Sequence, residues 1–225
     1  KINFKKKLEL NDIYFRYNNE SDYIFENLNL SISKGEIIGI SGKSGIGKTT
    51  LLDLISSLVK PNKGELKIDG ISINTANISR KLQNITSYSS QKTTVINATI
   101  KENICFGLEK NFDEDKLSKV IDFSNLNEFD NIDKNKISIS DAGKNISGGQ
   151  LQRIGLARAL YLDREILILD EATSALDLET EKKIFEKLLR LKGTKTIIIV
   201  THRVNNLEIC DKIYELKNKK LILKK

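Results

Sequence analysis

The segment Gly42-Lys-Ser-Gly-Ile-Gly-Lys-Thr49 has the composition of a phosphate-binding loop. It follows the apolar run Glu36–Ser41 and precedes a segment with helical spacing. The pattern G-x-x-x-x-G-K-[ST] therefore lies between a predicted strand and a predicted helix, which is the context that this motif requires. Glycines let backbone N–H groups curl around phosphate oxygens at a helix N-terminus. Lys48 would reach the β- and γ-phosphates of a nucleotide, and the Thr49 hydroxyl would coordinate Mg²⁺.

Two carboxylates follow the apolar run that begins at Ile166. Four apolar residues carry the predicted strand through the core and place Asp170 at its carboxyl end, where a carboxylate can bind Mg²⁺ directly or through water. Glu171, one residue further on, can accept the proton of an attacking water. A general base of this kind typically contributes about 10²–10⁴ in rate.

The single histidine of the chain, His202, follows the apolar run Thr196–Thr201. Ligands of open α/β sheets bind at the carboxyl ends of parallel strands. We therefore predict that His202 contacts the γ-phosphate of the bound nucleotide.

A second phosphate-binding element is predicted where a helix begins with Ser147-Gly-Gly-Gln150. Ser147 is a suitable N-cap, and a glycine costs backbone entropy unless something must approach closely. A helix N-terminus with bare backbone favours anions. Since nothing nearby in the sequence supplies the rest of a phosphate site, the phosphate is expected to come from elsewhere.

The hydrophobic patterns predict an α/β fold with a mostly parallel core sheet, an N-terminal antiparallel sheet and an inserted helical region. Alternating apolar residues predict antiparallel strands over residues 8–17 and 28–32, and Asp69-Gly70 predicts a hairpin within residues 65–73. Continuous apolar runs predict buried parallel strands at residues 36–41, 166–170 and 196–201. Helices are predicted over residues 49–59, 99–105, 113–123 and 178–191, and after Gly148.

The composition of the chain argues against several other classes of function. The chain has 225 residues, 37 Lys and Arg against 30 Asp and Glu, and a formal net charge of +7. The lysines are scattered and no aromatic-rich basic stripe accompanies them, so we expect no nucleic-acid partner.

No apolar run is long enough to span a membrane. The two cysteines lack metal-binding spacing, so no metal other than Mg²⁺ is expected. There is no methionine, even at position 1, and we expect the chain to be a piece of a longer protein.

Taken together, the phosphate loop, the strand ending in Asp-Glu and the Ser-Gly-Gly-Gln segment resemble an ABC ATPase, the nucleotide-binding domain of ABC transporters. The resemblance covers nearly the whole chain. It implies a P-loop NTPase core with its β subdomain at residues 1–92 and 158–225, and a helical subdomain at residues 93–157. It also implies that two such domains pair head to tail, so that the signature segment Ile146–Gln150 of one meets the ATP held by the phosphate loop of the other.

The resemblance implies further roles, residue by residue. The expected catalytic residues are Lys48, Gln91, Glu171 and His202. The expected ATP-binding residues are Tyr17, which would stack on adenine, and Ile24, Gly42, Ser44, Gly45, Ile46, Gly47, Lys48, Thr49, Thr50 and Gln91. The expected Mg²⁺ ligands are Thr49, Gln91 and Asp170, and the signature residues are Ile146, Ser147, Gly148, Gly149 and Gln150. The loop Ser174, Ala175, Leu176 and Asp177 is expected to cross the dimer interface.

The segment Gln91–Ile104 is similar to the exporter type of this family, in which Asn-x-Thr-Ile-x-Glu-Asn-Ile follows the glutamine. Thr201-His-Arg203 fits the same group. This implies that transmembrane domains contact residues 91–104 and that the chain lies at the cytoplasmic face of a membrane, with the bacterial inner membrane favoured. Three departures from the pattern are Ile146 in place of leucine, Ser90 in place of proline, and Ser140–Gly143, which lacks a glutamate often found before the signature.

Alternatives remain open at this point. A soluble ABC-type ATPase acting on nucleic acid or ribosomes is the second hypothesis, although it normally has long insertions or two cassettes, which are absent here. A binding module without turnover would need a degenerate Glu171 or His202. A homodimer is favoured over a heterodimer because every catalytic element is present in this copy. The sequence does not identify the transported substrate.

Overall fold

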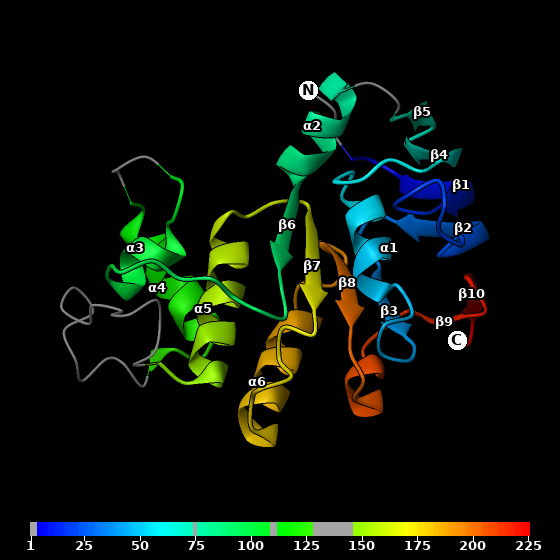
Figure 1. Cartoon of the computed structure of the whole chain (residues 1–225). Coiled ribbons are helices and arrows are strands. Elements are labelled where there is room, and N and C mark those ends of the chain that lie inside the picture. The colour runs from blue at the N-terminus through cyan, green and yellow to red at the C-terminus, as the bar shows by residue number, and fades with distance from the viewer. Residues whose placement is uncertain (1–3, 74–75, 109–111, 128–145) are drawn as a thin grey trace. The chain divides into compact units, whose positions relative to one another are not determined.

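The computed structural model describes residues 4–73, 76–108, 112–127 and 146–225 (Figure 1). The chain divides into two compact units. Unit 1 comprises residues 1–87, 164–168 and 192–225, and unit 2 comprises residues 88–163 and 169–191. No helix among the described residues combines the length and apolar character needed to cross a membrane.

Unit 1 contains a four-stranded antiparallel sheet in the order β2-β1-β4-β5. Its strands are β1 (Lys7–Phe15), β2 (Phe25–Ser33), β4 (Lys63–Ile68) and β5 (Ile71–Ser72). Leu10 pairs with Leu30 of β2 and with Leu66 of β4, so the alternating apolar residues lie on one buried face. Asp69 and Gly70 both have positive φ, which matches the tight turn expected between β4 and β5.

The second sheet has six strands in the order β10-β9-β3-β8-β7-β6. Its strands are β3 (Ile37–Ser41), β6 (Thr86–Ser89), β7 (Ile166–Asp170), β8 (Thr196–Val200), β9 (Lys212–Lys217) and β10 (Lys220–Leu223). Strand β3 pairs in parallel with β8 and β9, whereas β9 and β10 are antiparallel. All five residues of β7 and of β8 are buried, as the continuous apolar runs predicted. The predicted α/β class is confirmed.

The helices of unit 1 are α1 (Lys48–Ile55), α2 (Ala76–Ile85) and the 3₁₀ helix η3 (Val204–Leu207). Helix α1 is shorter than the predicted helix at residues 49–59. Ser57 adopts a left-handed φ of 55°, and the Leu58 N–H donates to the Asp53 carbonyl 2.8 Å away. This hydrogen-bonded C-terminal turn stops the helix before Val59.

Unit 2 contains α3 (Ile100–Ile104), α4 (Glu114–Phe123), α5 (Gly148–Tyr161) and α6 (Leu178–Leu189). Side chains cap the first turns of all four helices: Thr99, Asp113, Ser147 and Asp177 each accept from a backbone N–H three residues on. Helix α5 packs against α3 and α4 (Figure 1). The predicted helices in this region are therefore confirmed, apart from α6, which ends two residues early.

Among the described residues, five elements were not predicted from the sequence, namely α2, β6, η3, β9 and β10. Strand β9 has the sequence Lys-Ile-Tyr-Glu-Leu-Lys, and only Leu216 within it is buried. Strand β9 forms because its backbone pairs in parallel with that of β3. The local hydrophobic pattern does not indicate such pairing.

A glycine in α5 allows close packing within unit 2. A methyl group at Gly155 would lie 2.3 Å from Thr93 Oγ1 and 3.1 Å from Thr93 Cγ2. Although alanine normally stabilises a helix interior by about 1 kcal/mol relative to glycine, we expect Gly155→Ala to lower the free energy of unfolding by about 1–3 kcal/mol because of this overpacking. Urea denaturation measures the change.

The matched control is the double variant Gly155→Ala/Thr93→Ala, which removes both clashing atoms and should recover the lost stability. A single Gly155→Ala variant more stable than the wild type would contradict the close approach of α5 to residue 93.

Candidate functional site

The phosphate loop connects β3 to α1 in unit 1. Gly42, Gly45 and Gly47 have φ values of 153°, 73° and 107°, which lie in the region that favours glycine. A Cβ on Gly47 would lie 2.7 Å from Ile24 Cγ2, so this position also lacks room for a side chain. The loop therefore ends in bare backbone at the N-terminus of α1, an arrangement suited to an anion.

Lys48 is buried, with 6% of its surface exposed, and its ammonium lies at the phosphate loop. Its Nζ donates to the carbonyl oxygens of Gly42 and Lys43, each at 3.0 Å, and lies 3.3 Å from Nε2 of His202. The donor and acceptor roles of the two nitrogens in this contact depend on the tautomer of the imidazole. The predicted lysine and histidine of the phosphate site thus lie side by side.

The other predicted nucleotide contacts in unit 1 surround the same helix. Tyr17 is 59% exposed, and its hydroxyl lies 3.1 Å from Thr50 Oγ1. Its ring meets that of Phe15 edge-on, with the centroids 5.0 Å apart. An exposed aromatic ring fixed at two points can stack on a base. Thr49 is exposed in the first turn of α1, whereas Thr50 is buried.

The two predicted carboxylates lie in unit 2, where each has a side-chain partner. The Tyr88 hydroxyl donates to Asp170 Oδ2 at 2.9 Å. The Gln91 amide donates to Glu171 Oε2 at 2.7 Å. Glu171 has a left-handed φ of 49°, which is uncommon for a residue other than glycine. The structure therefore brings the predicted pair Gln91 and Glu171 together.

The signature segment forms a capping box at the start of α5. The Ser147 hydroxyl accepts from the Gln150 N–H at 3.2 Å, and the Gln150 side chain accepts from the Ser147 N–H at 2.9 Å. Ile146, just before the cap, is buried. The Gln150 side chain thus helps to cap the N-terminus of its own helix. The remaining signature residues, Ser147, Gly148 and Gly149, face a hollow.

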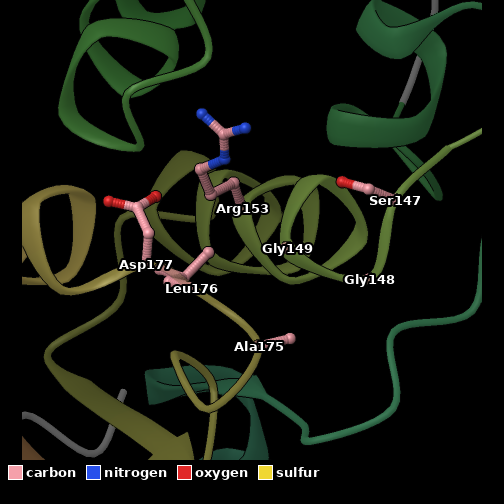
Figure 2. Close-up of a pocket in the computed structure, with 7 residues that line it drawn as sticks. All are labelled: Ser147, Gly148, Gly149, Arg153, Ala175, Leu176 and Asp177. Carbon is pink, nitrogen blue, oxygen red and sulfur yellow. The ribbon is translucent and has the colours of Figure 1, made fainter.

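This hollow has a volume of about 380 Å³ and lies between the start of α5 and the loop before α6 (Figure 2). It is lined by Ser147, Gly148, Gly149, Arg153, Ala175, Leu176 and Asp177. Three residues of the predicted dimer loop therefore join three of the predicted signature.

Asp177 ends the predicted dimer loop as the N-cap of α6. The Thr180 N–H donates to its carboxylate at 2.9 Å and holds the pKa of Asp177 below its ordinary value. The loop is therefore fixed at its end by a charged cap.

The predicted membrane-domain contact, residues 91–104, is held by polar groups and presents apolar side chains. Asn103 is fully buried, and its side chain exchanges hydrogen bonds with the backbone of Ile96. Arg158 of α5 donates to the carbonyl oxygens of Thr94 and Asn103. Ile96 is 42% exposed, and Phe106 just beyond the segment is 54% exposed. The departure noted at Ser140–Gly143 lies outside the described residues.

Two polar contacts of the site were missed from the sequence. Tyr88 holds Asp170 from β6, a strand that was not predicted. Gln152 is buried at 4% exposure and contacts Gln91, Glu171, Ser174 and Ala175. The burial of Gln152 could have been inferred from the helical spacing of Gln152, Leu156 and Ala159. This spacing places a polar amide on an apolar helix face.

Comparison with known proteins gives consistent results. The sequence model of the family described as ABC transporter matches residues 25–174. The chain is 36% identical over 223 residues to an "ATP-dependent lipid A-core flippase" of Pseudoalteromonas translucida (strain TAC 125), with 97% of this chain and 38% of that protein covered. It is 35% identical over 219 residues to "ABC transporter B family member 21" of Arabidopsis thaliana, with 96% of this chain and 17% of that protein covered.

Among solved structures, the "Structure of a bacterial Atm1-family ABC exporter with ATP bound" is similar, with a TM-score of 0.88 and 26% identity. The similarity covers 97% of this chain and 38% of that chain. The present chain thus spans well under half of the length of these proteins. Because the family's sequence model covers residues 25–174 and the relatives align along almost the whole chain, the chain belongs to the ABC transporter family.

Proposed function

We propose that the chain is the ATP-hydrolysing motor domain of an exporter-type ABC transporter, which dimerises head to tail around two ATP molecules to drive export or flipping of a substrate. The observation that carries the proposal is the 2.7 Å hydrogen bond from the Gln91 amide to the Glu171 carboxylate. This hydrogen bond orients the carboxylate of Glu171, which follows Asp170 in the sequence and can accept a proton. The names of the relatives, a lipid A-core flippase and an exporter, support the exporter type.

Each residue has a defined task in this proposal. The backbone of the phosphate loop and the Lys48 ammonium bind the phosphates, and Tyr17 stacks on the adenine. Glu171 accepts the proton of the attacking water, which Gln91 orients. His202, whose Nε2 lies beside Lys48, contacts the γ-phosphate. Ser147 and Gly149 bind the γ-phosphate held by the partner domain.

The donor set fits Mg²⁺. A threonine hydroxyl, an amide and a carboxylate, from Thr49, Gln91 and Asp170, offer the hard oxygen ligands that this ion prefers. When bound, the ion neutralises charge on the phosphate oxygens. The Tyr88 hydroxyl orients the Asp170 carboxylate.

The proposed partners are a second, identical ATPase domain and transmembrane domains that contact residues 91–104 at the cytoplasmic face of a membrane. The exposed Ile96 and the neighbouring exposed Phe106 and Leu108 offer apolar area for such a contact. The alternative, a soluble ATPase acting on nucleic acid or ribosomes, is not favoured by the relatives.

Loss of the loop lysine should weaken ATP binding. Lys48→Ala removes a buried positive charge that the carbonyl oxygens of Gly42 and Lys43 hold at the loop. Since a hydrogen bond to a charged group contributes about 1.5–3 kcal/mol, the Kd for ATP should rise about 10- to 100-fold. Isothermal titration calorimetry measures it. Lys60→Ala, which removes an exposed charge after α1, is the control, and equal affinity of the two variants would exclude the assigned phosphate loop.

Loss of the general base should separate binding from hydrolysis. Glu171→Gln keeps an oxygen that can accept from Gln91 but cannot take a proton, so ATP should bind and persist. Turnover should fall roughly 10²–10⁴-fold, and ATP-bound dimers should accumulate on a sizing column. The control Glu186→Gln changes an exposed carboxylate of α6. Retained turnover in Glu171→Gln would move the base elsewhere, with His202 the first residue to test.

A mixing experiment tests whether the signature serves the partner's ATP. Ser147→Arg keeps the phosphate loop but blocks the hollow at α5, whereas Lys48→Ala has the opposite defect. With both in the Glu171→Gln background, neither variant alone should dimerise well with ATP. Their mixture should recover dimers that hold one intact composite site.

Analytical ultracentrifugation with labelled ATP measures the recovery. A mixture that behaves as the plain sum of its two components would show that the signature acts within its own chain.

A further inference from the structure

Gln152 is a buried amide on α5. Only 4% of its surface is exposed, and it shares a helix face with Leu156 and Ala159, both of which are 1% exposed. A buried amide is unfavourable unless its donors and its acceptor are paired. The partners of Gln152 are therefore a structural requirement of unit 2.

Those partners come from three separate segments. The Gln152 Oε1 accepts from the Ala175 N–H at 2.8 Å. Its Nε2 lies 2.9 Å from Ser174 Oγ, 3.2 Å from the Glu171 carbonyl and 3.4 Å from the Gln91 carbonyl. One side chain thus joins the segment after β6, the turn after β7 and the loop before α6.

Two of these contacts fix the proposed base and its partner from the backbone side. The Glu171 carbonyl accepts from Gln152 and from the Ser174 N–H at 3.1 Å, which holds the left-handed backbone of Glu171 in place. The Gln91 carbonyl accepts from the same Gln152 amide, while the Gln91 side chain donates to the Glu171 carboxylate. Gln152 closes this ring of three residues.

We propose that Gln152 is a positioning residue for ATP hydrolysis, which fixes Glu171 and Gln91 relative to each other and to the helix that begins at Ser147. This inference rests on the proposed function, because Glu171 acts as the base there. Gln152 acts through Glu171 and touches no reacting atom.

The first test is Gln152→Met, which keeps length and volume but removes the donors and the acceptor. We expect kcat to fall about 10- to 100-fold, as for a misplaced catalytic group. The Kd for ATP should change much less, because the phosphate loop, Lys48 and Tyr17, which make most of the proposed ATP contacts, belong to unit 1. The matched control is Gln83→Met in α2, where Nε2 donates to the Ser57 carbonyl at 3.0 Å. It should leave kcat unchanged.

A double-mutant cycle separates positioning from a general structural role. If Gln152 acts through the Glu171 carboxylate, Gln152→Met should have little further effect on the residual turnover of Glu171→Gln. A general loss of folded structure would reduce turnover by the same factor in both backgrounds. That result, or wild-type kcat in Gln152→Met, would overturn the proposal.

Amide hydrogen exchange gives a readout independent of turnover. Gln152→Met takes away the acceptor of the Ala175 N–H, so a peptide covering residues 171–177 should exchange faster, while Gln83→Met should leave it unchanged. Unaltered exchange in Gln152→Met would reject the positioning role. A wild-type protein without ATPase activity would count against the proposed function instead, and the exchange result would still decide whether Gln152 orders this segment.

Discussion

Hydrogen bonds from polar side chains of one helix, α5, connect separate segments of unit 2. Gln152 and Arg153 on α5 are each at most 6% exposed, and Arg158 is half-buried. Each reaches carbonyl oxygens outside its own helix, because a buried donor without a partner is strongly unfavourable. Gln152 donates to the carbonyl oxygens of Gln91 and Glu171. Arg153 donates to the carbonyl oxygen of Asn125, and Arg158 donates to those of Thr94 and Asn103. The helix that opens with the signature therefore orders the segment after β6, the end of α4 and the turn after β7.

Each unit carries a distinct part of the proposed chemistry. In unit 1, the loop between β3 and α1 gathers backbone N–H groups, the Lys48 ammonium and the His202 imidazole, which suit a phosphate. In unit 2, Gln91 and Glu171 form a pair suited to activating water. Unit 1 is held by backbone ladders on both sides of β3, whereas unit 2 depends on helix caps and side-chain contacts. The phosphate-binding groups are therefore positioned by a β-sheet. The groups proposed for hydrolysis are positioned by side-chain hydrogen bonds, so a single substitution can displace them.

The parts that the sequence predicted are those in which the signal is local. Residues 42–49 place glycines, lysine and threonine within one loop, and the strand ending at Asp170 carries its own hydrophobic pattern. The packing of Tyr88 and Gln152 was not predictable in this way. Tyr88 lies 82 residues from its partner Asp170, and Gln152 lies 61 residues from Gln91. Such hydrogen bonds depend on which segments the fold brings together. Strand β9 was missed for the same reason, because its ladder partner β3 lies far back in the sequence.

The two paired glycines of the signature have different surroundings. A Cβ on Gly149 would lie 3.0 Å from the Ala175 carbonyl oxygen, so the approach of the loop before α6 already favours glycine there. A Cβ on Gly148 would meet the Ala175 Cβ at 3.6 Å, an ordinary contact, and its φ is not in the left-handed region. The described residues thus give a packing reason for glycine at position 149 and none for glycine at position 148. Gly148 is exposed and lines the hollow together with Ser147 and Gly149 at the N-terminus of α5. In the head-to-tail dimer proposed above, the phosphate assigned to Ser147 and Gly149 would approach over this bare backbone, where a side chain at position 148 would be in its way.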